Sequence, residues 1–282
     1  MRFAITSNDR YLGVFAAFVQ AGWQPLRLIT TPVKNGFDSQ HAVIAYAEKL
    51  NVDVQFTKLT KQDLDALHNQ ACDVLILAGY DWRMIDWQPY FKYAVNFHAS
   101  PLPEARGPYP AIRAILEDKD QWGITCHKVS PAFDEGDILA KEMFPLQSDE
   151  CHESLDLKIQ MAAKKLATHV ASRFTELWER AEPQKEGSYW KSPTVNERVI
   201  DFQASVDTVL RHIRAFGATG TLAKINDTWL TVKLAVGWSA LHQDRPGYVV
   251  HVFNRFIVVA VMDGYIALLD TEITPASIAA QL

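Results

Sequence analysis

The sequence contains few cysteines and no long apolar run. Its 282 residues include three cysteines, and the odd, widely spaced set Cys72, Cys126 and Cys151 fits a reducing compartment better than a disulfide framework. No stretch approaches the roughly 18 apolar residues that cross a membrane, and the first residues lack a signal-peptide pattern. We therefore expect a cytoplasmic protein.

An excess of positive charge is also missing. The chain has 28 Lys and Arg against 33 Asp and Glu, a formal charge of −5, and a pI near 6.0. This balance disfavours a surface that binds nucleic acid generally, although it leaves a local basic patch open. Hydrophobic residues make up 48% of the chain, enough for a substantial core in one large domain or two ordinary ones.

Several common motifs are missing. No Gly-x-Gly-x-x-Gly follows the first apolar run at residues 3–6, which disfavours an ordinary dinucleotide-binding domain, and no Walker loop occurs. No Gly-x-Ser-x-Gly elbow is present, which disfavours serine hydrolysis. The pairs at 126–127 and 151–153 contain Cys, His and Glu but lack zinc-site spacing. We therefore expect no metal.

Hydrophobic periodicity predicts an α/β protein with a second, smaller domain. Short apolar strands alternate with amphipathic helices over residues 1–182, which indicates a mainly parallel sheet. Residues 183–199 are polar, contain Pro and Gly, and are predicted to form a linker. Short alternating strands over 200–282 indicate a small β-barrel or β-sandwich. The expected strands are 3–6, 25–30, 52–56, 74–79, 93–98, 122–129, 138–146, 229–235, 247–252, 256–261 and 265–270, and the longest expected helix is 154–180.

Polar side chains gather at the end of one predicted strand. Asn96 and His98 are two positions apart, so strand alternation points both to the same side. The strand stops at a turn rich in Pro and Gly that runs to Pro110. An amide and an imidazole placed side by side suit a site where an oxyanion forms. Further on, Asp134 offers a carboxylate in a tight turn.

The ordered combination is more specific than its parts. Asn-x-His-x-Ser-x-Leu-Pro-x-x-x-Gly at 96–107, a Gly-x-Thr strand at 123–125 and Asp-x-Gly-Asp at 134–137 resemble the folate-dependent formyltransferases. That family includes glycinamide ribonucleotide, methionyl-tRNA and aminosugar formyltransferases. A looser match, at 200–202 and 213–216 among others, is similar to the C-terminal domain of methionyl-tRNA formyltransferases. The resemblance implies a Rossmann-like formyltransferase sheet, a small β-barrel-like C-terminal domain, and 10-formyltetrahydrofolate as cosubstrate.

The resemblance also implies roles for individual residues. Asn96, His98 and Asp134 match the family's catalytic asparagine, histidine and aspartate. Asn96 and a protonated His98 would hold the oxyanion that forms when an amine attacks the formyl carbon. Asp134 would keep His98 charged and could take the proton that the amine loses. The Leu102–Pro103 bond is predicted to be cis, as in the family.

Further contacts follow from the same resemblance. Residues 77–84 look like the family's pterin-binding segment, and the turn at 130–137 would close the other side. For Trp82, Met84 and Arg106, an ordinary surface or core role stays equally open. The expected cofactor contacts are Tyr80, Trp82, Met84, Ala132 and Asp137, and the expected substrate contacts are Ser7, Asn8 and Arg106.

The acceptor amine is the least determined feature. Residues 201–282 carry six Lys and Arg against seven Asp and Glu, whereas tRNA binding needs clustered cations. The loop at 31–40, where the tRNA enzymes carry a basic insertion, has Lys34 as its only cation. We therefore expect a small amine, such as a nucleotide-linked aminosugar. The alternatives are a methionyl-tRNA formyltransferase and a non-catalytic folate-binding homologue, and a homodimer through the C-terminal domain is expected by likeness to the aminosugar enzymes.

Overall fold

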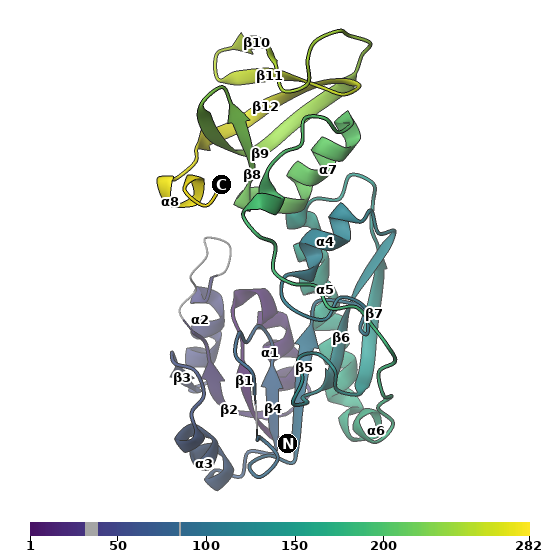
Figure 1. Cartoon of the computed structure of the whole chain (residues 1–282). Coiled ribbons are helices and arrows are strands. Elements are labelled where there is room, and N and C mark those ends of the chain that lie inside the picture. The colour runs from purple at the N-terminus through teal and green to yellow at the C-terminus, as the bar shows by residue number, and fades with distance from the viewer. Residues whose placement is uncertain (32–38, 85) are drawn as a thin grey trace. The chain divides into compact units, whose positions relative to one another are not determined.

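The computed structural model describes residues 1–31, 39–84 and 86–282. The chain forms two compact units (Figure 1). Unit 1 comprises Met1–Pro110, Gln121–Pro145 and Leu157–Trp190, and unit 2 comprises Ala111–Asp120, Leu146–Asp156 and Lys191–Leu282. Lys34 lies outside the described residues. In the part of the chain that the structure describes, no helix is long and apolar enough to cross a membrane.

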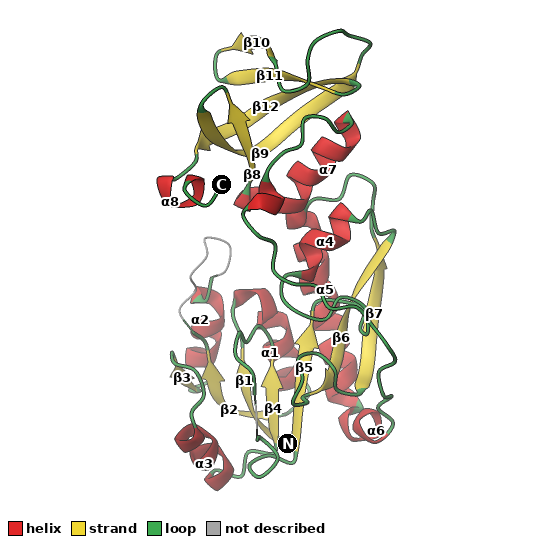
Figure 2. Ribbon diagram, in the orientation of Figure 1, coloured by secondary structure: helices red, strands yellow, loops and turns green. Residues whose placement is uncertain are grey.

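Unit 1 is built on a seven-stranded sheet (Figure 2). Its strands are β1 (Arg2–Thr6), β2 (Gln24–Ile29), β3 (Asp53–Gln55), β4 (Val74–Leu77), β5 (Tyr93–His98), β6 (Gln121–Lys128) and β7 (Ile138–Pro145). They lie in the order β3-β2-β1-β4-β5-β6-β7. The first five pair in parallel, whereas β6 and β7 pair antiparallel. The predicted mainly parallel sheet is confirmed.

The helices of unit 1 follow the predicted alternation, with one difference. They are η1 (Asp9–Tyr11), α1 (Leu12–Gln20), α2 (His41–Lys49), α3 (Lys61–Asn69), α5 (His152–Ser172), whose first residues belong to unit 2, and α6 (Phe174–Glu179). A capping box between Thr60 and Asp63 fixes the start of α3. The single helix predicted over 154–180 is wrong, because Arg173 leaves the helical conformation. The Ser172 hydroxyl donates to the His169 carbonyl at 2.8 Å, a local bond that competes with helix continuation.

The strand order explains where a ligand can enter. All four residues of β4 are buried, as expected for a central strand covered on both faces. The chain passes from β1 to β2 on one side, whereas β4 lies on the other side of β1. In open α/β sheets, ligands bind outside the carboxyl ends of the strands at such a reversal. β5 is the next strand, so its carboxyl end faces the same edge of the sheet.

Unit 2 contains an antiparallel sheet covered by a helix. Its elements are most of α4 (Pro110–Leu116), η2 (Asn196–Arg198), α7 (Val206–Phe216), η3 (Gly217–Thr219), β8 (Thr221–Ile225), β9 (Thr228–Ser239), β10 (Val249–Phe253), β11 (Phe256–Val261), β12 (Gly264–Ile273) and α8 (Ala276–Ala279). The strand order is β10-β11-β12-β9-β8. Ser205 caps α7, whose apolar face, including Val209 and Ile213, packs into one core with Val232 and Leu268. The predicted small C-terminal β domain is confirmed, and its strands form one five-stranded antiparallel sheet; β8 was not predicted.

Candidate functional site

Strand β5 and the loop that follows it carry the first two polar groups of the site. Asn96 lies opposite His127 of β6, and His98 lies opposite Thr125. The Thr125 hydroxyl accepts from the Leu102 amide at 3.1 Å and donates to the Ser100 carbonyl at 2.7 Å, which fixes the start of the loop. The Leu102–Pro103 peptide bond is cis, so this prediction is confirmed.

Backbone groups of the same loop reach back into the site. His98 Nε2 lies 2.9 Å from the Ala105 carbonyl oxygen, which can only accept, so Nε2 carries a proton. In the neutral ring Nδ1 is then unprotonated and can accept a proton or a hydrogen bond. The Gly107 amide donates to Asp134 Oδ2 at 2.9 Å. Ala105 and Gly107 both have positive φ, at 58° and 98°. The loop therefore orients one side chain from β5 and one from a distant turn.

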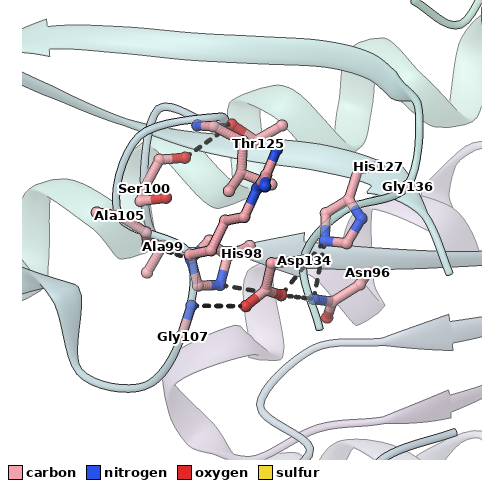
Figure 3. A network of polar contacts seen from close by, with 12 residues as sticks. Asn96, His98, Ala99, Ser100, Ala105, Gly107, Thr125, His127, Asp134 and Gly136 are labelled. Carbon is pink, nitrogen blue, oxygen red and sulfur yellow. Dashed lines mark hydrogen bonds and ion pairs between the residues drawn. The ribbon is translucent and has the colours of Figure 1, made fainter. Parts of the chain in front are cut away.

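Asp134 completes a cluster of three polar side chains (Figure 3). Its Oδ1 atom accepts from the Asn96 amide at 3.2 Å and lies 3.5 Å from His98 Nδ1. The three residues predicted from the motif thus converge from β5 and from the turn between β6 and β7. Asp134 itself adopts φ 57°, a left-handed conformation that aspartate tolerates better than most residues.

His127 is a fourth member of the cluster that the sequence analysis missed. Its Nδ1 atom lies 2.8 Å from the Lys128 carbonyl oxygen, so Nδ1 carries the proton and Nε2 can accept. Nε2 lies 3.1 Å from the Asn96 amide nitrogen and 3.6 Å from Asp134 Oδ1. His127 therefore holds the Asn96 amide with its nitrogen toward Asp134.

Burial and hydrogen bonding set the charges of the cluster. Burial lowers the pKa of His98, and the Asp134 carboxylate and the Ala105 carbonyl only partly offset it. The protonated His98 expected from the sequence is therefore not the resting form at neutral pH. Burial alone would raise the pKa of Asp134, but His127, His98 and the Gly107 amide outweigh it and bring that pKa to about 2. A neutral imidazole thus faces an ionised carboxylate.

The segment expected to bind the pterin lies beside the turn at 130–137. The Arg83 side chain donates to the Pro131 carbonyl, and Trp87 Nε1 donates to the Val129 carbonyl at 3.2 Å. Tyr80 and Trp82 have ring centroids 5.2 Å apart, and the Tyr80 hydroxyl accepts from the Leu59 amide at 3.0 Å. Trp82 is 37% exposed. These two aromatic residues stay candidates for pterin contact.

The other three expected cofactor contacts have partners within the protein. Met84 is buried in the core cluster that also contains Trp87, which favours the core role that the sequence left open. The Asp137 carboxylate pairs with Lys128 Nζ at 3.0 Å. The Ala132 carbonyl accepts from the Ser130 hydroxyl at 2.8 Å. Roles for Met84, Ala132 and Asp137 in cofactor binding stay predictions.

The expected substrate contacts differ in their surroundings. Ser7 is buried, and its hydroxyl donates to the Asn8 carbonyl at 3.1 Å. The Asn8 Oδ1 atom is buried without a hydrogen-bond partner in the described chain, which leaves an acceptor at the end of β1. Arg106 Nε and Nη2 both donate to Gln184 Oε1, at 3.1 and 2.9 Å. An anion contact by Arg106 stays a prediction, and its bonds favour a structural role.

A resident metal has no evident ligand set here. Among the described residues, no group of three or more His, Cys, Asp and Glu side chains is arranged to hold an ion. Within the same residues, Cys126 is buried in β6 and unpaired, and burial raises the pKa of its thiol. The imidazole, carboxylate and amide of the polar cluster are groups that can transfer protons and bind an oxyanion.

Comparisons with known proteins show the family of the chain. Residues 34–171 match the formyl transferase domain, and residues 194–279 match the formyl transferase C-terminal domain. The methionyl-tRNA formyltransferase of Halorhodospira halophila is 27% identical over 271 residues, which cover 92% of this chain and 86% of that protein. That of Coprothermobacter proteolyticus is 31% identical over 188 residues, covering 64% of this chain and 60% of that protein.

Solved structures share the fold at lower identity. An N-formyltransferase from Helicobacter canadensis, in complex with folinic acid and dTDP-3-aminofucose, has a TM-score of 0.69 at 16% identity, covering 96% of this chain and 99% of that one. HypX from Aquifex aeolicus, in complex with tetrahydrofolic acid, has a TM-score of 0.67 at 18% identity. The alignment covers 98% of this chain and 44% of HypX. The chain belongs to the formyl transferase family, whose enzymes transfer formyl groups.

Proposed function

We propose that this enzyme transfers the formyl group of 10-formyltetrahydrofolate to a primary amine of a small molecule, such as a nucleotide-linked aminosugar. The main support is the convergence of Asn96, His98 and Asp134 at the carboxyl end of β5. The folate ligands of HypX and of the Helicobacter canadensis enzyme give further support. In this proposal Tyr80 and Trp82 contact the pterin, and Asn8 contacts the acceptor.

In the proposed reaction His98 acts first as a base. Because its Nε2 proton is held by the Ala105 carbonyl, His98 Nδ1 takes a proton from the amine as the new carbon–nitrogen bond forms. The resulting imidazolium is stabilised by Asp134, 3.5 Å away. The Asn96 amide exchanges its bond to Asp134 for one to the oxyanion. His98 then returns the proton to the folate nitrogen as the old carbon–nitrogen bond breaks, which releases tetrahydrofolate and the formylated amine.

The pH dependence of kcat/KM should report the neutral form of His98. Since burial lowers its pKa, kcat/KM should show an acid limb that rises with pH through a pKa below about 6.5, the ordinary value for histidine. Asp134, with a pKa of about 2, should add no limb in this range. Steady-state rates between about pH 5 and 8 test this. A rate that falls as pH rises through neutrality would contradict a neutral base.

The choice of a small acceptor is supported by the cations of residues 201–282. Five of the six Lys and Arg there have intramolecular partners, which leaves few for phosphates. Arg211 pairs with Asp118, Arg214 donates to the Glu150 and Ser148 carbonyls, Lys233 pairs with Glu272, and Lys224 and Arg255 lie over the rings of Trp229 and Phe256.

Formylation of methionyl-tRNA is the second candidate, favoured by the similarity to the Halorhodospira halophila enzyme over most of its length. An acceptor panel separates the two. The enzyme is incubated with 10-formyltetrahydrofolate and either aminosugar nucleotides or charged initiator tRNA, and tetrahydrofolate release is followed. We expect turnover with a sugar nucleotide, and turnover with charged tRNA alone would overturn the choice.

The predicted homodimer remains a prediction that sedimentation at several protein concentrations would test.

A further inference from the structure

Residues 182–190, most of which lie in the stretch expected to be a linker, run against both loops of the site. On one side Glu182 exchanges two backbone hydrogen bonds with Ile138, at 2.8 and 3.0 Å. On the other side the Ser188 hydroxyl accepts from the Ala105 amide at 2.8 Å, and the Ser188 carbonyl accepts from the Arg106 amide at 2.9 Å. This segment therefore lies between the turn that carries Asp134 and the loop that orients His98.

Gln184 makes the side-chain contacts that join the two loops. Its Nε2 group donates to the Asp134 carbonyl at 2.7 Å and to the Gly136 carbonyl at 2.8 Å. Its Oε1 atom accepts both bonds from Arg106. The two donors and the acceptor of the amide are all engaged, so its orientation is fixed. In the sequence Arg106 lies between Ala105, whose carbonyl is hydrogen-bonded to His98, and Gly107, whose amide donates to the Asp134 carboxylate.

The turn at 134–136 has a conformation that needs such support. Asp134 has φ 57°, and a residue in this region persists only when its surroundings hold it there. A Cβ atom on Gly136 would lie 1.8 Å from the Lys128 carbonyl oxygen, so the turn is pressed closely against β6. Without Gln184, two partly buried carbonyls would lose their donors and the turn would relax. The Asp134 carboxyl would then move relative to His98 Nδ1.

We propose that Gln184 is a positioning residue for formyl transfer, which holds the Asp134 turn at the distance from His98 that the reaction requires. This role rests on the proposed function, because it matters only if Asp134 and His98 act together. Gln184 reaches Asp134 through its backbone and touches no reacting atom. A misplacement of about 1 Å in a catalytic group can cost on the order of a hundredfold in rate, so a bond of this kind has a large effect on kcat.

Two substitutions and a control test the proposal. Gln184→Leu removes every hydrogen bond of the amide, and Gln184→Glu keeps the acceptor for Arg106 but loses the two donors to the turn. Glu186→Gln, an exposed side chain two residues along, is the matched control. We expect both Gln184 variants to lose about ten- to a hundredfold in kcat, and folinic acid to bind with a Kd within about threefold of the wild type. The control should match the wild type.

The pKa of His98 can be measured as a second test, because it should not change if Gln184 only stabilises the fold. Asp134 raises the pKa of His98 and His127 lowers it, so a displaced carboxyl in Gln184→Leu should shift the acid limb of the rate profile to lower pH. NMR of isotope-labelled histidine measures the same shift without turnover. The NMR measurement separates the proposed function from the proposed role of Gln184. If the wild type were inactive with every acceptor, the proposed function would fail, but the effect of Gln184→Leu on the His98 pKa could still be measured.

Three results would overturn the role of Gln184. The first is a kcat for Gln184→Leu within about twofold of the wild type, since misplacement should cost far more. The second is recovery of kcat in Gln184→Glu, which would mean that the bond to Arg106 alone suffices. The third is a fall in kcat that equals the fall in the fraction of enzyme able to bind folinic acid, with the pKa of His98 unchanged. That result would mean that the substitution only unfolds part of the protein.

Discussion

Asp134→Asn is expected to lower kcat by about 10²- to 10⁴-fold, the range found for groups that assist proton transfer. The substitution removes the negative charge 3.5 Å from His98 Nδ1, so the imidazolium that forms during transfer loses its stabilising partner. Asparagine tolerates positive φ about as well as aspartate, so the turn should keep its backbone conformation. The new amide nitrogen cannot accept, however, so one of the two bonds that the carboxylate accepts, from the Gly107 amide or from Asn96, is lost as well. Tetrahydrofolate release, measured under saturating folate and amine, reports the effect.

The control for Asp134→Asn is Glu135→Gln. Glu135 is the next acidic residue along the same turn, and its side chain is 52% exposed and 3.6 Å from Arg106. Because the Glu135 carboxylate is largely in water, although the Arg106 side chain is only 14% exposed, the pair should contribute little, on the order of 1 kcal/mol or less, and this variant should turn over like the wild type. Equal losses in the two variants would mean that the turn, and not the Asp134 carboxylate, limits the rate.

His98→Ala should lose at least about 10²-fold in kcat, because the base that takes the amine proton is removed. The loss should not multiply with that of Asp134→Asn. A carboxylate that acts by stabilising the imidazolium has little left to do once the imidazole is gone, and residues that act as a unit are strongly non-additive. The double variant should therefore be nearly as active as the worse single variant.

Protein integrity has to be checked for His98→Ala, because His98 is 9% exposed and its ring bonds to the Ala105 carbonyl. Folinic acid binding and the near-ultraviolet circular dichroism of the variant provide that check. Losses that multiply in the double variant, with both single variants folded, would show that His98 and Asp134 contribute independently. That result would contradict the proposal that Asp134 acts by stabilising the His98 imidazolium.

Part of the site could be predicted because it depends on a short-range pattern. Asn96 and His98 share a strand, and alternation alone puts them on one side. Asp134 could be placed beside them only through the family resemblance, since no local rule brings residues 96 and 134 together. His127 could not be placed in the site from the pattern. It lies opposite Asn96 in β6, but the register of two antiparallel strands is not written in either strand alone.

Other parts of the site could not be predicted, for physical reasons. The Ala105 carbonyl and the Gly107 amide are backbone groups, so the residue types at these positions do not reveal the hydrogen bonds that they make. Gln184 lies in a polar stretch whose composition indicates a linker, and composition does not reveal hydrogen bonds to a turn fifty residues away. Met84 follows an apolar strand, and an apolar residue there suits a ligand pocket and a core equally well. The charge of His98 depends on burial, which only the fold determines.

The most direct test of the central claim compares binding with chemistry in Asp134→Asn. Wild type and variant are each saturated with 10-formyltetrahydrofolate, mixed with the acceptor that the panel identifies, and followed through a single turnover, with the Kd of folinic acid measured on the same preparations. We expect Kd values within about threefold of each other and a transfer rate at least about 10²-fold lower in the variant. A variant that transfers its formyl group at the wild-type rate, or that loses binding and rate in proportion, would contradict the claim that the Asn96, His98 and Asp134 cluster performs the transfer.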